Sequence, residues 1–422
     1  MGGQAETSSL EGFPESLLDW IANDGAASES IPLLIDSYCR FLNSHGFAIR
    51  RCNLATETVH PLMGNTRHVW FDRATDPGPI NPAVIVERRQ YHLAGSMIDE
   101  VYFNGGSQKN PQYLASPFHR VEELGELYET VRPAGQDQPF PLFNDLATLG
   151  CTAYSAFRLN NFAGMLQKLG LSTDRPGGYD EARRAALRAS VAMLTLHLNT
   201  LVEHDTKRTL ARVYVGDDPG RRVCAGMINL GEVVSLDAAI WFSDIRGFTH
   251  SSDGAVPERL IERLNGYFET VASAIYGSGG EILKYIGDAV LAIFPVGEDG
   301  DRRAACEAAL AALDRADAGL DALNRHYAEL GEEPFAHGVG LHVGTVSYGN
   351  IGSRERLDFT VIGPAVNLAS RIEGMCKELG KSALCSDLFA DAACPTAEPL
   401  GAFALKGIAD PVALHAPPVS VG

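Results

Sequence analysis

Apolar positions change their spacing along the first part of the chain. Over residues 16–47 they recur at helical intervals, which predicts two helices, the second with Ser30 as its N-cap and Pro32 near its start. The spacing then shortens to that of β-strands separated by turn-rich segments. With a closing helix near 160–170, this pattern predicts an α+β module over 16–175. The short apolar or alternating runs lie at 48–54, 67–72, 83–87, 100–104 and 151–158.

A long helical pattern begins near Tyr179, after the Pro-Gly-Gly break at 176–178. Its apolar residues are spaced 4, 3, 4 and 3, which matches the seam of a coiled coil between two chains. A helix packed against its own domain would show the same stripe, so two interpretations stand. We assign residues 176–222 to a signalling helix and linker. The stripe consists of Leu187, Val191, Leu194, Leu198 and Leu201.

The last stretch, residues 223–417, alternates helical and strand-like patterns, with a hairpin inside. This order predicts a mixed α+β or α/β sandwich of the ferredoxin-like kind. Strands are expected at 233–243, 281–295, 335–343 and 357–362, and helices at 256–276, 301–328 and 364–376.

The composition is that of an ordinary soluble globular protein. The chain has 422 residues, 45% of them hydrophobic and 21% charged, which suits two or three domains with cores of their own. With 35 Lys+Arg against 53 Asp+Glu, the net charge is −18, so we expect no nucleic-acid partner and no general attraction to anionic membranes. An anionic substrate must therefore be held locally by metal and a few basic groups.

The cysteines and the apolar runs indicate the cellular compartment of the protein. The eight cysteines show no CxxC pair and no zinc spacing, which favours reduced thiols in the cytoplasm. Residues 1–15 are predicted to be a disordered lead-in and lack the pattern of an export signal. Because no run of about 18 apolar residues occurs, no membrane span is predicted.

Two aspartates carry the most specific chemistry. Asp244 and Asp288 each end an apolar run typical of a buried strand, so both carboxylates are expected at the rim of a sheet, where they can meet hard cations. Gly287 and Asp288 predict the tight turn of a hairpin. Each aspartate also has a simpler interpretation, as a solvated strand end or a turn former. Together they predict a site for two metal ions that act in a phosphoryl displacement.

A candidate phosphate turn follows Asp244. Gly247 lets the backbone approach a phosphate, and the helix start beyond it offers unpaired N–H groups and a positive dipole end. Gly247, Phe248 and Thr249 are therefore included in the candidate substrate site.

Residues 223–417 resemble the catalytic domain of class III nucleotidyl cyclases, which make cyclic AMP or cyclic GMP. The resemblance covers the module in order and implies the ferredoxin-like fold of that family. It is carried by the segments FSDIRGFT (242–249), LNGYF (264–268), GGEILKYIGDAVLAIF (279–294), GLHVGTVSYGNIG (340–352) and DFTVIGPAVNLASRIE (358–373).

The resemblance implies sites shared between two catalytic domains arranged head to tail. Asp244, Ile245 and Asp288 of one chain would hold two Mg²⁺ or Mn²⁺ ions, and the ribose 3′-hydroxyl of ATP would attack the α-phosphorus in line as pyrophosphate leaves. From the other chain, Asn367 would orient the ribose and Arg371 would meet charge developing on the phosphorus. Because these two are four residues apart, they share a helix face; outside this motif they would be taken for surface residues.

Base choice depends on two further positions. Lys284 matches the family's lysine that donates to adenine N1, and Thr360 lies where many adenylyl cyclases carry Asp and a bacterial subset, which includes bicarbonate-responsive enzymes, carries Thr. Since lysine only donates, it suits adenine N1 and opposes the guanine N1–H, so ATP is the expected substrate. A guanylyl or mixed-specificity cyclase is the alternative, because a hydroxyl discriminates less firmly than a carboxylate. Lys406 matches a lysine that contacts the triphosphate, although a Lys-Gly turn is common.

One chain carries all of these parts, which implies a homodimer with two equivalent sites. An alternative from another class is a non-catalytic module that binds nucleotide and signals by dimerisation. Such modules usually lack a metal aspartate or the Asn/Arg pair, and both are present here.

Residues 16–175 resemble, in element order only, small ligand-sensing domains of the GAF type, which implies an unknown small-molecule or ionic regulator. Histidines and aromatic residues there suit a haem, flavin or small-molecule pocket, or equally a plain core with surface histidines. The cysteines there suit a redox response or simple burial. The residues concerned are His45, His60, His68, His92, His119, Trp70, Phe71, Tyr91, Tyr102, Phe103, Cys39, Cys52 and Cys151.

Overall fold

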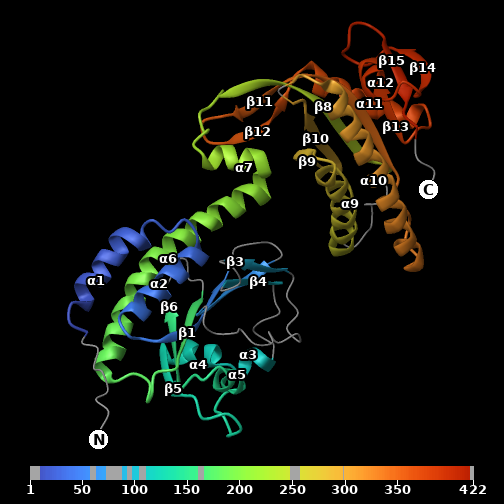
Figure 1. The fold of residues 1–422 in the computed structure, drawn as a ribbon. Helices are drawn as coiled ribbons and strands as arrows, with labels where there is room; N and C mark the ends of the chain where they lie inside the picture. The colour runs from blue at the N-terminus through green and yellow to red at the C-terminus, as the bar shows by residue number, and fades with distance from the viewer. Residues whose placement is uncertain are drawn as a thin grey trace, which may run out of the picture. The chain divides into compact units, whose positions relative to one another are not determined.

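The computed structural model of the protein describes residues 10–57, 63–72, 88–92, 97–103, 111–159, 166–247, 257–297 and 299–418. By its internal contacts the chain divides into two units, Met1–Leu210 and Ala211–Gly422, each with its own sheet and core (Figure 1).

A seven-stranded antiparallel sheet forms the centre of the N-terminal unit, in the order β3-β4-β2-β1-β7-β6-β5. Its central strands β1 and β7 are almost wholly buried, because helices cover both of their faces. The strands are β1 Ile49–Glu57, β2 Met63–Phe71, β3 Arg88–His92, β4 Met97–Phe103, β5 Glu126–Thr130, β6 Ala153–Leu159 and β7 Gln167–Thr173.

Two sets of helices cover this sheet. The first set, α1, α2 and α6, packs on one face and forms the larger core with Leu54 and Leu171 of the sheet. The second set, α4 and α5, packs on the opposite face around Tyr154. The helices are α1 Phe13–Trp20, which continues as a π-helical turn Ile21–Gly25, α2 Ile31–Ser44, α3 Pro111–Leu114, α4 Pro117–Leu124, α5 Leu142–Thr148 and α6 Glu181–Val215.

Most predicted elements of this unit are present, and two expectations need correction. The helix predicted near 160–170 is wrong, since β7 occupies Gln167–Thr173 and pairs with β1 and β6. The lead-in is shorter than predicted, because α1 begins at Phe13 and Phe13 is buried in the core. The strand expected at 83–87 lies outside the described residues.

The apolar stripe of α6 lies in the core of its own unit. Leu187, Leu194 and Leu198 are fully buried there, with Val191 beside them. The structure therefore favours a helix packed on its own domain over a coiled-coil seam at these positions. By length and composition alone α6 also resembles a membrane span, but a stripe already buried by a sheet and helices is typical of a core helix.

The C-terminal unit contains an eight-stranded sheet in the order β14-β15-β13-β11-β8-β10-β9, with β12 paired to β11. Strands and helices follow as β8-α9-β9-β10-α10-β11, and the four strands lie in the order β11-β8-β10-β9, which is the ferredoxin-like arrangement predicted above. The strands are β8 Val233–Ile245, β9 Glu281–Ile286, β10 Ala289–Pro295, β11 His337–Gly352, β12 Leu357–Ile362, β13 Ala383–Ser386, β14 Glu398–Phe403 and β15 Val412–Ala416.

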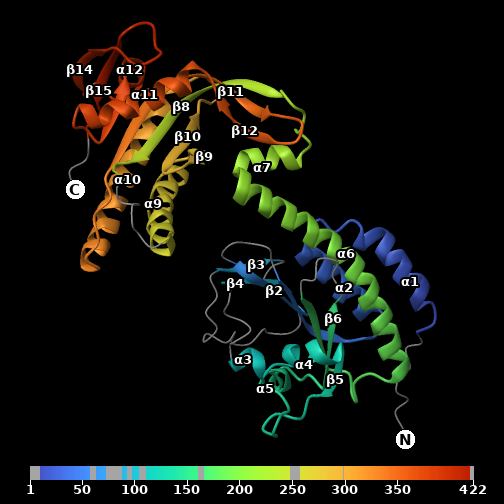
Figure 2. The same ribbon diagram turned by 180° about the vertical axis from the view of Figure 1, so that it is seen from behind.

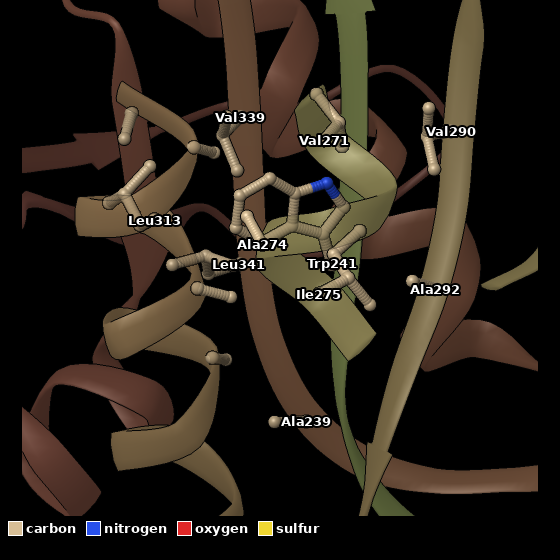
Figure 3. Close-up of a cluster of buried hydrophobic side chains, with 14 of the residues drawn as sticks. Ala239, Trp241, Val271, Ala274, Ile275, Val290, Ala292, Leu313, Val339 and Leu341 are labelled. Atoms are coloured by element: carbon tan, nitrogen blue, oxygen red, sulfur yellow. The ribbon is translucent and has the colours of Figure 1, made fainter. Parts of the chain in front are cut away.

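Helices lie on both faces of this sheet. α9 and α10 run side by side on one face together with α12, and α11 covers the other (Figure 1, Figure 2). Trp241 of β8 is fully buried under α9 and α10, among small and branched side chains of three strands (Figure 3). This packing fixes β8, whose end carries Asp244. The helices are α7 Asp217–Cys224, α9 Pro257–Gly277, α10 Arg302–Glu329, α11 Pro364–Glu378 and α12 Asp387–Ala393.

Candidate active site

The two predicted aspartates meet at one rim of the sheet. Asp244 lies at the end of β8, opposite Gly338 of β11. Asp288 lies in the two-residue turn between β9 and β10, where Gly287 has a φ of 67°, a conformation that favours glycine. Because β10 pairs with β8 in register, with Val290 opposite Ser243, the turn reaches the end of β8. The hairpin prediction is confirmed, although the last residues of β9 are exposed rather than buried.

The electrostatics of this pair suit a cation. Burial, together with the charge and hydrogen bond of the Asp288 carboxyl, raises the pKa of the Asp244 carboxyl to about 6. Oδ1 of Asp244 is buried and has no hydrogen-bond partner among the described residues. A buried oxygen without a donor and a neighbouring carboxylate are the features that a hard cation satisfies.

The described residues contain no cluster of three or more His, Cys, Asp or Glu that would hold a metal unaided. Two carboxylates are nevertheless sufficient for Mg²⁺, which usually keeps waters and takes further oxygens from substrate phosphates. The residues therefore fit metal that arrives with a nucleotide.

Glu373 is a third carboxylate near the pair, and the sequence analysis missed it. Burial and the nearby charge of Asp244 raise the pKa of Glu373 to about 7, although Arg246 opposes the rise. Its side chain lies over Gly338, where any Cβ would overlap Glu373 Oε1. The sequence did contain a signal for Glu373: it is a charged residue on the buried side of α11, four positions after Ala369.

A buried polar chain supports the strand that carries Asp244. The Tyr267 hydroxyl and His337 Nδ1 are 3.3 Å apart, and His337 Nε2 is 3.1 Å from Asp317 Oδ1. On β8 itself, Trp241 Nε1 donates to Ser243 Oγ at 3.0 Å. The first two contacts join α9, β11 and α10 beneath the rim, and the pairing of β11 with β8 passes this support to the end of β8.

The phosphate turn is described only in part. Ile245 is buried in the core with its side chain, so only its backbone is available at the rim. Arg246 Nε donates to the His337 carbonyl at 3.1 Å, and its guanidinium also donates to the Lys381 carbonyl. Gly247 begins the turn with a φ of 74°. Phe248 and Thr249 lie outside the described residues.

The structure brings the predicted base-reading residues to neighbouring strands. Lys284 on β9 donates from Nζ to Asp358 Oδ2 of β12 at 2.5 Å, and both side chains are 42% exposed. Thr360 lies two positions after Asp358, on the same side of β12, while Phe359 faces the core. The sequence analysis missed Asp358, although the alternation of this strand pairs it with Thr360.

The remaining candidates lie on other elements. Asn367 and Arg371 are both exposed on α11, opposite its buried residues, as their spacing predicted. Lys406 lies in an exposed turn between β14 and β15. In the sheet order β13 and β11 separate β15 from β8, so the described structure does not place Lys406 beside the aspartate pair.

Comparisons with known proteins identify the family of the C-terminal unit. Residues 234–381 match the family described as adenylate and guanylate cyclase catalytic domain. An adenylate cyclase of Anabaena cylindrica is 38% identical over 160 residues, which is 38% of this chain and 31% of that protein. Adenylate cyclase 1 of Rhizobium meliloti is 36% identical over 385 residues, which is 88% of this chain and 55% of that protein. The C-terminal unit is a class III nucleotidyl cyclase domain.

The similarity extends beyond this cyclase domain. The stretch shared with the Rhizobium meliloti protein is longer than either unit, so it includes much of the N-terminal unit as well. The chain spans about half or less of the length of these two relatives. Among solved structures, the adenylyl cyclase CyaB from P. aeruginosa is 28% identical, with a TM-score of 0.40, over 45% of this chain and 97% of that one.

Proposed function

We propose that the protein is an adenylyl cyclase that converts ATP to 3′,5′-cyclic AMP and pyrophosphate at two sites shared by a homodimer. The observation that carries the proposal is the Asp244–Asp288 pair at the rim of a cyclase domain, with a buried carboxylate oxygen that no described residue pairs. That both relatives above are named adenylate cyclases supports the choice of reaction.

Asp244 and Asp288, with the backbone of Ile245, would hold Mg²⁺ or Mn²⁺, two ions per site, which supply positive charge to the triphosphate and acidify the ribose 3′-hydroxyl. Gly247 lets the chain pass close to the phosphates. Asn367 and Arg371 of the other subunit orient the ribose and stabilise the charge that develops on the phosphorus. Their common exposed face on α11 leaves both side chains available to a partner.

Exposed apolar residues support the homodimer. Tyr285 and Ile286 of β9 are 46% and 47% exposed, and Ile362 of β12 is 50% exposed. β9 ends the sheet of the subunit and lies next to β12. Apolar side chains gathered on neighbouring strands at a sheet edge are typical of a surface that another chain covers.

ATP is favoured over GTP by the donor at Lys284. Asp358 holds the Lys284 ammonium at 2.5 Å, so the lysine is oriented before the base arrives. An ammonium can donate to adenine N1 but can only oppose the N1–H of guanine, and the Thr360 hydroxyl can accept from the adenine 6-amino group.

The substrate is tested by incubating the purified chain with Mn²⁺ and either ATP or GTP and measuring both cyclic nucleotides. Faster formation of cyclic AMP supports the proposal. Faster formation of cyclic GMP would show a guanylyl cyclase, and the absence of both products would show a non-catalytic module.

Shared sites are tested by mixing inactive variants. Asp244→Ala and Arg371→Ala each remove a different half of the site, so after subunit exchange a mixture should recover about a quarter of wild-type activity from one working site per heterodimer. The matched control mixes Asp244→Ala with Asp288→Ala, which damage the same half and should recover nothing. Recovery in the control, or none in the first mixture, would contradict shared sites.

We further propose that the N-terminal unit is a regulatory domain. We place the enzyme in the cytoplasm, where ATP is available and its thiols stay reduced. The seven buried cysteines, which include Cys39, Cys52 and Cys151, suit packing better than a redox response.

A further inference from the structure

The N-terminal unit buries an arginine that has no acidic partner among the residues that the structure describes. Arg51 on β1 is 8% exposed, and its Nη1 is buried without a hydrogen-bond partner in the described part of the chain. Burial lowers the pKa of its guanidinium, and the nearby charge of Arg67 lowers it further. The other groups with the largest influence on it in the described structure are Tyr154, Cys52 and Cys151, and none of these is a carboxylate.

The preceding residue of the strand, Arg50, shows the contrast. Arg50 Nη1 is 2.8 Å from Asp72 Oδ2, and its Nε is 3.0 Å from Asp174 Oδ2. This partly exposed arginine has two acidic partners, whereas the more deeply buried Arg51 has none among the described residues.

Further unsatisfied polar groups lie on the same face of the sheet. Ser172 of β7 is opposite Arg51 in the register, and Tyr154 of β6 is opposite Ser172, so the three side chains form one row across the sheet. The Ser172 hydroxyl is fully buried and has no hydrogen-bond partner among the described residues. Within the same described residues Asn53, two positions after Arg51, also has a buried, unpaired side-chain oxygen. Hydroxyl and amide groups can each donate to an anion, once the amide is turned.

An apolar wall adjoins these groups. Phe71 of β2 is opposite Arg51, with its ring centroid 5.9 Å from the guanidinium carbon. Val69 and Ile98 continue this wall and form a small buried cluster with Phe71. The face therefore offers a cation and polar groups at one place and apolar contacts beside them.

A buried guanidinium without a counter-charge is strongly unfavourable. A cation–π contact at this distance offsets only a small part of that cost, and a second arginine nearby adds to it. An anion that accepts two hydrogen bonds from the guanidinium would remove the cost and use the other donors as well.

We propose that this face of the N-terminal sheet binds a small organic anion, with its carboxylate or phosphate on Arg51 and Ser172 and its apolar part against Phe71. Asn53 and Tyr154 complete the polar end, and Val69 and Ile98 the apolar end. The N-terminal unit would therefore recognise this class of ligand. Such binding is independent of the cyclase reaction, because it can be measured without activity.

Binding is tested on the full chain by thermal unfolding with sodium benzoate, sodium phosphate or sodium chloride at equal ionic strength. An anion present at about 100 times its dissociation constant should raise the unfolding midpoint of the N-terminal unit by roughly 5–10 °C. A shift with benzoate alone indicates a carboxylate ligand, and a shift with phosphate alone indicates a phosphate-bearing one. If neither anion exceeds chloride, the proposal is wrong.

Two variants locate the site. Arg51→Met should abolish the shift, and the matched control Arg188→Met, an arginine of the same unit paired with Glu181 at its surface, should keep it. An equal shift in Arg51→Met and wild type would overturn the proposal. If Arg51→Met does not fold, Ser172→Ala serves in its place, because it removes one unpaired hydroxyl and should weaken binding about tenfold. An unchanged dissociation constant in Ser172→Ala would then overturn it.

Discussion

Replacing Asp244 by Asn should stabilise the metal-free cyclase domain while it abolishes the reaction. Burial and Asp288 raise the pKa of Asp244 to about 6 from 3.8. Between pH 3.8 and about pH 6 the folded domain therefore still binds a proton that the unfolded chain has already released. The free energy of unfolding falls as the pH rises through this window, and above about pH 6 the full cost of the ionised carboxylate is present.

The size of the effect follows from the shift. About two pKa units correspond to about 3 kcal/mol, and partial exposure of the carboxyl to solvent reduces this to about 1–3 kcal/mol. An Asn amide carries no charge and can donate a hydrogen bond to Asp288, as the protonated acid does. Asp244→Asn should therefore be more stable than wild type by about 1–3 kcal/mol at pH 8, and by about half as much at pH 5.

Urea unfolding in the presence of a chelator measures this difference in the free energy of unfolding. The control is Asp321→Asn on the exposed surface of α10, which should be as stable as wild type. Added Mn²⁺ should stabilise wild type and leave Asp244→Asn unchanged, and the variant should form no cyclic AMP. The reasoning is refuted if Asp244→Asn is less stable than wild type at pH 8 without metal, or if Mn²⁺ stabilises both proteins equally.

Three further predictions concern other parts of the cyclase domain. Asp358→Asn should change the free energy of unfolding by less than about 1 kcal/mol, because its ion pair with Lys284 is exposed. Measurements of kcat/KM should show a several-fold smaller preference for ATP over GTP in this variant. An unchanged preference would contradict the role of Asp358 in positioning Lys284. Burial lowers the pKa of His342 to about 4 from 6.5, so the unfolded chain takes up a proton at a higher pH than the folded chain does. The free energy of unfolding should therefore fall by about 3 kcal/mol as the pH drops from 6.5 to 4. Urea unfolding at several pH values should show this fall in wild type and not in His342→Gln. Gly340→Ala would place a Cβ against the backbone of α11 and should cost about 3 kcal/mol in thermal unfolding, whereas Gly374→Ala, where a Cβ meets nothing within 4 Å, should cost nothing.

Local pattern was sufficient for most elements of the cyclase domain and for the positions of several candidate site residues on them. Strand and helix periods indicate which side of an element is apolar, and Gly287-Asp288 between two apolar runs predicts a hairpin without knowledge of the rest of the chain. The four-residue spacing of Asn367 and Arg371 likewise places both on one helix face. These conclusions depend only on residues close together in sequence, so sequence alone determined them.

The tertiary structure decided which partner each surface meets. The stripe on α6 has the same period whether a second chain or its own domain covers it, and only the fold shows Leu194 in the core of the N-terminal unit. The charge of Asp244 acts on Glu373, and Asp358 pairs with Lys284, because elements distant in sequence lie together. Arg51 looks ordinary as a strand residue, and only the fold shows that it is buried with no counter-charge in the part of the unit that the structure describes. Periodicity gives the direction of a side chain, but long-range packing sets its electrostatic environment, and that environment determines the chemistry.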